Sequence, residues 1–296
     1  MFPIARSRTV RSVIAMAALI ALATLAAAGC SSDADRTAAV ASTMPTETTA
    51  QHLAAATRRL VAPDRSNFPT GIGTVGLPCQ GTGNGPVGLV AGTDDPITRW
   101  DRLVEDAGQE VLFCRFDPSS ATRWRATPKA RADALSSALE QSGLPAPYVL
   151  VGHSLGGLTV RRFGVDHPDQ LGGALLLDPT TPDALRSLDE SLTADGWDVA
   201  ATQADADEAV TWADVPLPVL SHDPGTKALG LGPAVEALWT EGQRHYAELS
   251  SSGQFEQAPG AGHYIDHDAM NRSTRSMRSQ PKPPDDLRIS ASAQVM

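Results

Sequence analysis

The chain has 296 residues, of which 42% are hydrophobic, 34 acidic and 24 basic, and its formal net charge is −10 at pH 7. A charge this negative argues against nucleic acid and anionic lipid headgroups as partners, because both repel an acidic surface. Roughly 200 residues, from about 70 to about 270, have the composition of a folded region, which is enough for one α/β domain and too few for two.

The first 30 residues have the pattern of a secretory signal. Three arginines precede an apolar run from Val13 to Ala28, which is too short and too rich in small residues to favour a stable membrane span. The run ends in Leu-Ala-Ala-Ala-Gly-Cys, which is similar to the lipobox of bacterial lipoproteins, where cleavage exposes the cysteine for acylation. We therefore expect an exported protein that is held at the cell membrane by lipid on Cys30. Plain secretion is the alternative.

Two further segments are expected to lie outside the fold. Residues 31–67 are rich in Ala, Thr and Ser, with little hydrophobic periodicity, and such a composition buries too little surface to offset its ordering entropy. Residues 271–296 are polar and proline-rich. We predict a flexible linker, a folded domain over residues 68–270 and a disordered tail.

Strands and helices are predicted to alternate through the domain. The strands are expected over residues 75–80, 87–91, 111–116, 148–151, 171–177, 217–221 and 254–258, and the helices over 100–107, 130–142 and from Ser154 to about His167. Strands that alternate with helices of this length need crossover connections. The expected fold class is therefore α/β, with a mostly parallel sheet flanked by helices.

The remaining two cysteines form an even pair if Cys30 is acylated. Cys79 and Cys114 both fall in predicted strands, and an exported protein folds in an oxidising compartment. We expect a disulfide between them. Two buried free thiols are the alternative.

A candidate nucleophile lies where a buried strand turns directly into a helix. The apolar run from Tyr148 to Val151 ends at Gly152, and Ser154 follows on the turn in the pattern G-x-S-x-G. Glycines at both ends of the pattern leave room for a strained turn, which exposes the serine hydroxyl. The backbone N–H of Leu155, at the start of the helix, would face an oxyanion. The alternative is a glycine-rich turn without chemistry.

Around Ser154 the sequence G-H-S-L-G-G resembles the α/β-hydrolase family, in particular bacterial lipases and esterases. The resemblance implies a second oxyanion donor in the loop after residues 87–91, which is the backbone N–H of Thr93 or Asp94. A plain Asx-type turn is the alternative there. It also implies a cap over residues 181–216, for which an elongated crossover helix with a surface loop is the alternative.

In this family the histidine comes last in the order nucleophile, acid, histidine. His263 follows two glycines and a short strand, and it is the expected general base, with His267 as the fallback. The acid is expected at a strand end. Asp178 is favoured over Asp223, although strand-end aspartates before proline are often simple turn formers.

A serine nucleophile implies acyl chemistry on a small-molecule or lipid ester. The expected activity is hydrolysis of carboxylic esters through an acyl-enzyme on Ser154. Acyl transfer to another acceptor and cofactor-free perhydrolysis would use the same residues, and a surface lipoprotein without catalysis would use none of them. The sequence contains no metal-ligand cluster, phosphate loop or dinucleotide fingerprint, so no cofactor is expected.

Overall fold

The computed structural model describes residues 60–83, 85–92, 95–118, 126–187, 198–207, 211–227 and 229–268. The predicted signal with Cys30, most of the predicted linker and the predicted tail lie outside these residues. None of the helices described within them is long and apolar enough to cross a membrane.

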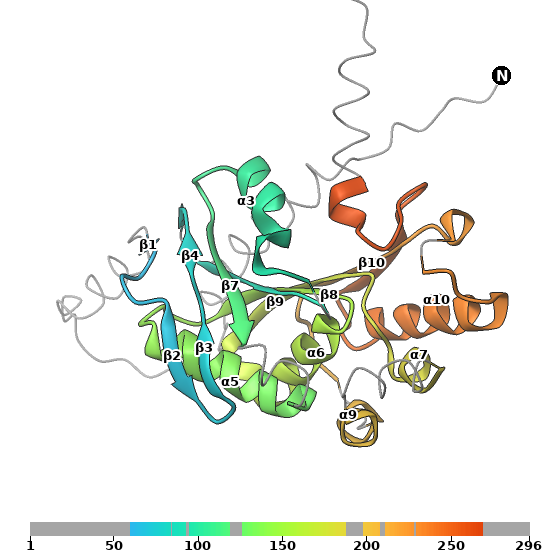
Figure 1. Ribbon diagram of the computed structural model, residues 1–296, viewed down its shortest axis with the longest axis horizontal. Coiled ribbons are helices and arrows are strands. Elements are labelled where there is room, and N and C mark those ends of the chain that lie inside the picture. The colour runs from blue at the N-terminus through green and yellow to red at the C-terminus, as the bar shows by residue number, and fades with distance from the viewer. Residues whose placement is uncertain are drawn as a thin grey trace, which may run out of the picture.

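Within the described residues a nine-stranded sheet forms the centre of the molecule (Figure 1). Its strands are β2 (Asn67–Thr70), β3 (Gly73–Gly76), β4 (Cys79–Gln80), β6 (Pro86–Val90), β7 (Leu112–Pro118), β8 (Tyr148–His153), β9 (Leu171–Leu177), β10 (Leu217–Ser221) and β11 (Gly253–Gln257). They follow the order β11-β10-β9-β8-β6-β7-β3-β2, and β4 also pairs with β7. Neighbours from β11 to β7 are parallel, whereas β2, β3 and β4 pair antiparallel at the other edge.

Helices cover both faces of this sheet. The helices are α3 (Asp101–Ala107), α5 (Pro128–Gln141), α6 (Gly156–Asp166), α7 (Pro182–Ser187), α9 (Val199–Asp207) and α10 (Pro233–Ala247). In Figure 1, α3 lies on one face, and α5, α6 and α10 lie on the other. Short 3-10 helices are η1 (Ile97–Trp100), η2 (Pro168–Gln170) and η3 (Pro224–Thr226). Outside the large sheet, β1 (Leu60–Val61) pairs with β5 (Thr82–Gly83).

The parallel strands are apolar on both sides because each side packs against helices. In β8, Val149 and Val151 belong to the cluster that contains Trp100 and Leu103, whereas Leu150 belongs to the cluster on the side of α5 and α6. Parallel strands that are covered on both faces read as continuous apolar runs rather than as alternating ones. The mostly parallel sheet flanked by helices confirms the predicted fold class.

The predicted disulfide is present. Cys79 and Cys114 lie directly opposite each other in the antiparallel pair of β4 and β7, and they are bonded with a Cα–Cα distance of 4.0 Å. The bond ties an edge strand to the sheet and closes a loop of 35 residues.

The strand predicted over residues 75–80 is two short strands, β3 and β4, and two further regions differ from the sequence prediction. The ladder of β1 and β5 shows that residues 60–67, assigned to the linker, already contribute strands. Helix α10 was not predicted, because its buried face carries Gly242 and Gln243 where a hydrophobic stripe would continue. Gly242 and Gln243 each have a structural role. A Cβ on Gly242 would lie 2.5 Å from the hydroxyl oxygen of Thr181, and Gln243 bonds to a buried carboxylate described below.

The predicted cap is only partly described. Helix α7 packs against α10, and α9 packs against α5 and α6. Between these helices, residues 188–197 lie outside the described part of the chain. The cap over residues 181–216 therefore stays a prediction.

Candidate active site

Ser154 occupies a sharp turn between β8 and α6. Its φ of 52° lies in the left-handed region, which a non-glycine residue rarely adopts. Two bonds hold the turn against the end of β9: the Ser154 N–H donates to the Leu177 carbonyl (3.2 Å), and the Thr180 N–H donates to the Ser154 carbonyl (3.0 Å). The chain must also pass close to β6, since a Cβ on Gly156 would lie 2.3 Å from the Val90 carbonyl oxygen. The glycines of the motif thus have the steric role that the sequence predicted.

Backbone donors for an oxyanion are expected beside this serine. Leu155 is the N-cap of α6, where backbone N–H groups have no partner within the helix. The predicted second donor, Thr93 or Asp94, lies outside the described residues. The preceding Gly92 does approach the serine, because a Cβ there would lie 3.2 Å from Ser154 Oγ. The loop after β6 therefore lies beside Ser154. The two oxyanion donors stay predictions.

Asp178 and His263 are joined by a short hydrogen bond. Asp178 directly follows β9 and has a φ of 43°, and its Oδ2 lies 2.6 Å from Nδ1 of His263, which follows β11. The carboxylate is fully buried, whereas the His263 side chain is 13% exposed. A charged acceptor on Nδ1 fixes the proton there, so Nε2 is left unprotonated and able to accept a proton.

Several donors converge on the Asp178 carboxylate. Trp239 Nε1 (2.9 Å) and Gln243 Nε2 (2.8 Å) on α10 bond to its Oδ1, and His222 Nδ1, after β10, lies 2.8 Å from Oδ2. Burial by itself would raise the pKa of Asp178, but the bonds from His222 and His263 outweigh it and hold the pKa well below the usual range. Asp178 is therefore a buried carboxylate that stays ionised.

Asp223, the other candidate acid, points elsewhere. Its carboxylate accepts from the Gly225 N–H (2.9 Å), which caps η3, and from the Gly260 N–H (2.7 Å). These bonds fix the loop that leads to His263. The contact with His263 is made by Asp178.

The three predicted triad residues lie at one edge of the sheet, where β8, β9 and β11 end. No hydrogen bond joins Ser154 Oγ to His263 within the described part of the chain. In unliganded enzymes such bonds are often long and tighten when the substrate binds. The neighbouring residue does reach His263: the ring centroids of His153 and His263 are 4.6 Å apart, and His153 Nε2 lies 3.1 Å from the His263 carbonyl oxygen.

A buried ionic cluster supports these loops from behind. His153 Nδ1 lies 3.0 Å from Asp95 Oδ2, and Arg99 bonds both to Asp95 and, through two nitrogens, to Asp266. Burial lowers the pKa of His153 to about 4, against the pull of Asp95. The pKa of Asp95 is about 2, because the contacts with His153 and Arg99 outweigh the effect of its burial. The cluster links the loop after β6, the serine turn and the segment after His263.

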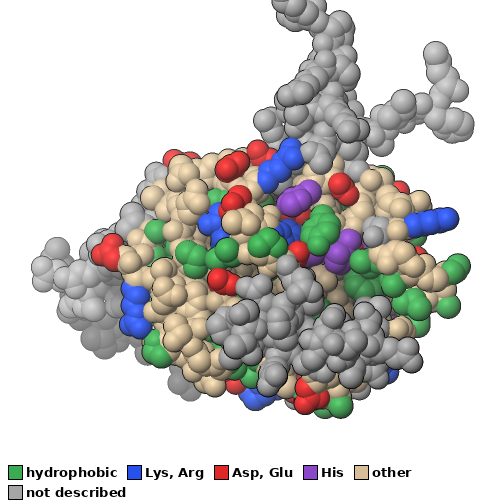
Figure 2. All heavy atoms as spheres, viewed as in Figure 1, with side chains coloured by type: hydrophobic (Ala, Val, Ile, Leu, Met, Phe, Trp, Pro, Cys, Tyr) green, Lys and Arg blue, Asp and Glu red, His purple; other side chains and the backbone are tan. Residues whose placement is uncertain are grey.

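Figure 2 shows histidine and hydrophobic side chains that reach the surface together on the face viewed. Tyr264, next to His263, is one of the exposed large hydrophobic residues, and its hydroxyl donates to Asp95 Oδ1 (3.2 Å). The fallback base, His267, bonds through Nε2 to the Arg99 carbonyl (3.1 Å). The Nε2 of His267 is therefore bonded to the backbone of η1.

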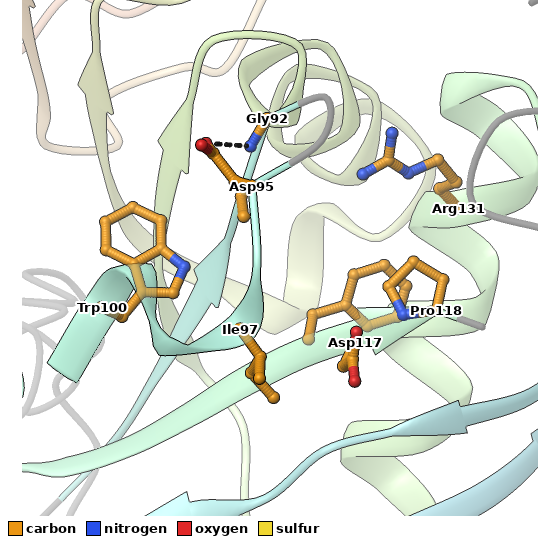
Figure 3. Close-up of a pocket in the computed structure, with 9 residues that line it drawn as sticks. Gly92, Asp95, Ile97, Trp100, Asp117, Pro118 and Arg131 are labelled. Atoms are coloured by element: carbon orange, nitrogen blue, oxygen red, sulfur yellow. Dashed lines mark hydrogen bonds between the residues drawn. The ribbon is translucent and has the colours of Figure 1, made fainter. Parts of the chain in front are cut away.

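A small pocket opens beside the serine turn, at the carboxyl ends of β6 and β7 (Figure 3). It is lined by Ala91, Gly92, Asp95, Ile97, Trp100, Phe116, Asp117, Pro118 and Arg131. The Arg131 side chain extends from α5 toward this space, and the Gly92 N–H is turned to Asp95. Among the described residues no group of three or more His, Cys, Asp or Glu side chains could hold a metal ion.

The polar groups that contact the predicted triad from other elements are not predicted from the sequence. No role is predicted from the sequence for His222, and Gln243 lies on a helix that was not predicted. The signal available for His222 was its place directly after β10, at the same sheet edge as Asp178. Nothing in the local pattern pairs residues so far apart in the chain.

Comparisons with known proteins agree with this architecture. No family model matches the chain. Over 98 residues the chain is 33% identical to lipase LipV of Mycobacterium tuberculosis, a match that covers 32% of this chain and 37% of the length of that lipase. An esterase of Thermogutta terrifontis superposes with a TM-score of 0.51 at 20% identity, covering 75% of this chain and 97% of the esterase. The Mycobacterium tuberculosis protein Rv0554 gives a TM-score of 0.51 at 16% identity, covering 74% of this chain and 97% of Rv0554.

Proposed function

This chain has the α/β-hydrolase fold, and we propose that it is a serine hydrolase that cleaves carboxylic esters through an acyl-enzyme on Ser154. The observation that carries the proposal is the 2.6 Å bond from His263 to the buried Asp178, at the edge where Ser154 is held in a left-handed turn. The sequence similarity to a lipase supports the same class of substrate.

The proposed reaction begins with proton transfer to His263. With Nδ1–H bonded to Asp178, the Nε2 of His263 takes the proton from Ser154 while Oγ attacks the ester carbonyl. Asp178 stays ionised and stabilises the imidazolium that forms. The N–H groups of Leu155 and of Thr93 or Asp94 are the proposed donors to the tetrahedral oxyanion.

The first half-reaction ends when protonated His263 donates its proton to the leaving alcohol and the acyl group stays on Ser154. In the second half-reaction His263 takes a proton from water, which attacks the acyl-enzyme. His263 then returns this proton to Ser154 Oγ as the bond to the acyl group breaks, and the acid is released. The proposed substrates are small-molecule or lipid esters, in line with the names of the similar lipase and esterase.

Burst kinetics test this proposal. A p-nitrophenyl ester should release one equivalent of p-nitrophenol per protein in a fast phase before steady turnover, because an acyl-enzyme accumulates. Ser154→Ala should abolish both phases. Ser252→Ala, which removes an exposed hydroxyl in the turn before β11, is the matched control and should behave as the parent.

If the parent shows a burst but no steady phase in water, and added alcohol or peroxide restores the steady phase, the protein transfers the acyl group to another acceptor. That result would contradict hydrolysis. Turnover that survives Ser154→Ala would remove the serine mechanism. The absence of both the burst and steady turnover in the folded parent would favour a surface protein without catalysis.

We further propose that the protein is exported and anchored through lipid on Cys30. The disulfide between Cys79 and Cys114 supports export, since such bonds persist in oxidising compartments. Growth with a clickable fatty acid should label the parent and leave Cys30→Ser unlabelled and released from the membrane fraction. Equal labelling of the two proteins would contradict the anchor.

A further inference from the structure

His222 bridges two carboxylates in the interior. Its Nδ1 lies 2.9 and 2.8 Å from the two oxygens of Asp178, and its Nε2 lies 2.6 Å from Oε1 of Glu236 on α10. The histidine side chain is fully buried, and that of Glu236 is 14% exposed. The described residues thus place four ionisable side chains in a row: His263, Asp178, His222 and Glu236.

The hydrogen-bond chemistry of this row defines the charge of its third member. An ionised carboxylate only accepts hydrogen bonds, so a ring nitrogen that bonds to it must carry a proton. Both nitrogens of His222 face carboxylates, and a ring with two N–H groups is a cation. The bonds from Asp178 and Glu236 also raise the pKa of His222 above its ordinary value, although burial opposes this.

We propose that His222 is a buried imidazolium held by Glu236, and that it is a positioning residue which sets, through Asp178, the pH range in which His263 acts as a base. The proposal rests on the proposed function. The positive charge of His222 lies against Asp178 and offsets part of the negative charge that stabilises protonated His263. It therefore favours the neutral, basic form of His263 and extends activity to lower pH.

The groups around this row are accounted for within the described residues. Against His222 lie Asp178 at the end of β9, Glu236 on α10 and the Trp239 ring at 6.5 Å between centroids. The carboxylate of the next residue, Asp223, is bonded to backbone N–H groups.

His263 faces three aromatic rings as well as Asp178: His153, Tyr264 and Trp239. His153 is neutral at pH 6 and above, because burial lowers its pKa to about 4. In the neutral ring Nδ1 accepts a hydrogen bond from Arg99 Nε (3.2 Å), and Nε2–H donates to the His263 carbonyl. Apart from His263 itself, His222 is therefore the proposed cation next to Asp178, and its substitution removes that charge.

Nitrogen-15 NMR of the ring nitrogens tests the charge without any assay of turnover. At pH 8, about 1.5 units above the ordinary histidine pKa, the parent should show one histidine with both nitrogens protonated. The signal should be absent in His222→Gln, which assigns it. Glu236→Gln should convert His222 to a neutral ring, whereas Glu241→Gln, an exposed residue of the same helix, should leave it charged. A neutral His222 in the parent at pH 8 would overturn the proposal.

The pH dependence of kcat/KM tests the consequence. In His222→Gln the cation is lost, protonated His263 gains stability, and the acid limb should move to higher pH by about one unit. The ratio of activity at pH 6 to activity at pH 8.5 should then fall severalfold relative to the parent. A loss that is equal at every pH, or an unmoved acid limb, would show a merely structural role and overturn the proposal. If the parent itself has no turnover, the proposed function fails while the NMR result stands on its own.

Discussion

At the scale of single residues, the contacts of Asp178 and Asp223 separate two roles that the sequence left open. Both follow strands at the same edge of the sheet, and both precede proline. Asp178 meets His263, whereas Asp223 binds the N–H groups of the loop that carries His263. The acid of the proposed triad is thus distinguished by its partners and not by its position in the chain.

We predict that Asp178→Asn and Asp223→Asn have very different effects on kcat. Asp178→Asn removes the charge that orients His263 and stabilises its imidazolium, so kcat should fall by about a thousandfold or more. Asp223→Asn keeps an acceptor oxygen for the loop and should lower kcat only a few-fold. Circular dichroism verifies that both variants are folded, and the reverse ranking of the two kcat values would reassign the acid.

At the scale of elements, the turn from β8 to α6 depends on how closely it approaches β6. The steric reason lies in the backbone: the carbonyl oxygens of Val90 and Ala91 lie where a side chain on Gly156 would begin. A glycine at this position lets the helix start directly against the sheet, and the start of the helix holds the proposed nucleophile at its edge.

Gly156→Ala should therefore destabilise the fold as well as the site. Its Cβ would be 2.3 Å from the Val90 oxygen, and overpacking against backbone should lower the free energy of unfolding by more than about 2 kcal/mol. Gly71→Ala, which meets no atom within 4 Å, should change it by less than about 0.5 kcal/mol. Urea unfolding measures both. Equal stabilities would show that the turn can relax.

The element pattern also shows what a sequence can and cannot specify. Local apolar runs predicted β9 and β10 at the bounds that the structure has, because a buried strand is visible in its own residues. Helix α10 was missed because Gly242 and Gln243 serve contacts with distant residues. The same reasoning applies to the site: Ser154 lies in a local motif, whereas the bonds of Asp178 come from three other elements.

At the scale of the whole molecule, buried titratable groups couple the site to stability. His153 is neutral and fully enclosed, and its folded pKa of about 4 is below the ordinary value near 6.5. Between these two values the unfolded chain binds the proton more readily than the folded one. Stability must therefore fall as the pH drops through this window.

We predict that the free energy of unfolding decreases by about 3 kcal/mol when the pH is lowered from 6.5 to 4. His153→Gln should flatten this dependence, since the group that titrates is gone. Below pH 4, protonation of Asp95, whose folded pKa is about 2, should add a further loss in the parent. Denaturant unfolding at a series of pH values measures both, and an unchanged slope in His153→Gln would contradict the assignment.

The central claim is that Ser154 is a nucleophile activated by His263. Its most direct test is to treat the folded parent with a fluorophosphonate and to locate the adduct by mass spectrometry of the digested protein. The adduct should lie on the peptide that contains Ser154, and its rate of formation should drop sharply in His263→Gln. An adduct on another residue, or none on the folded parent, would contradict the account.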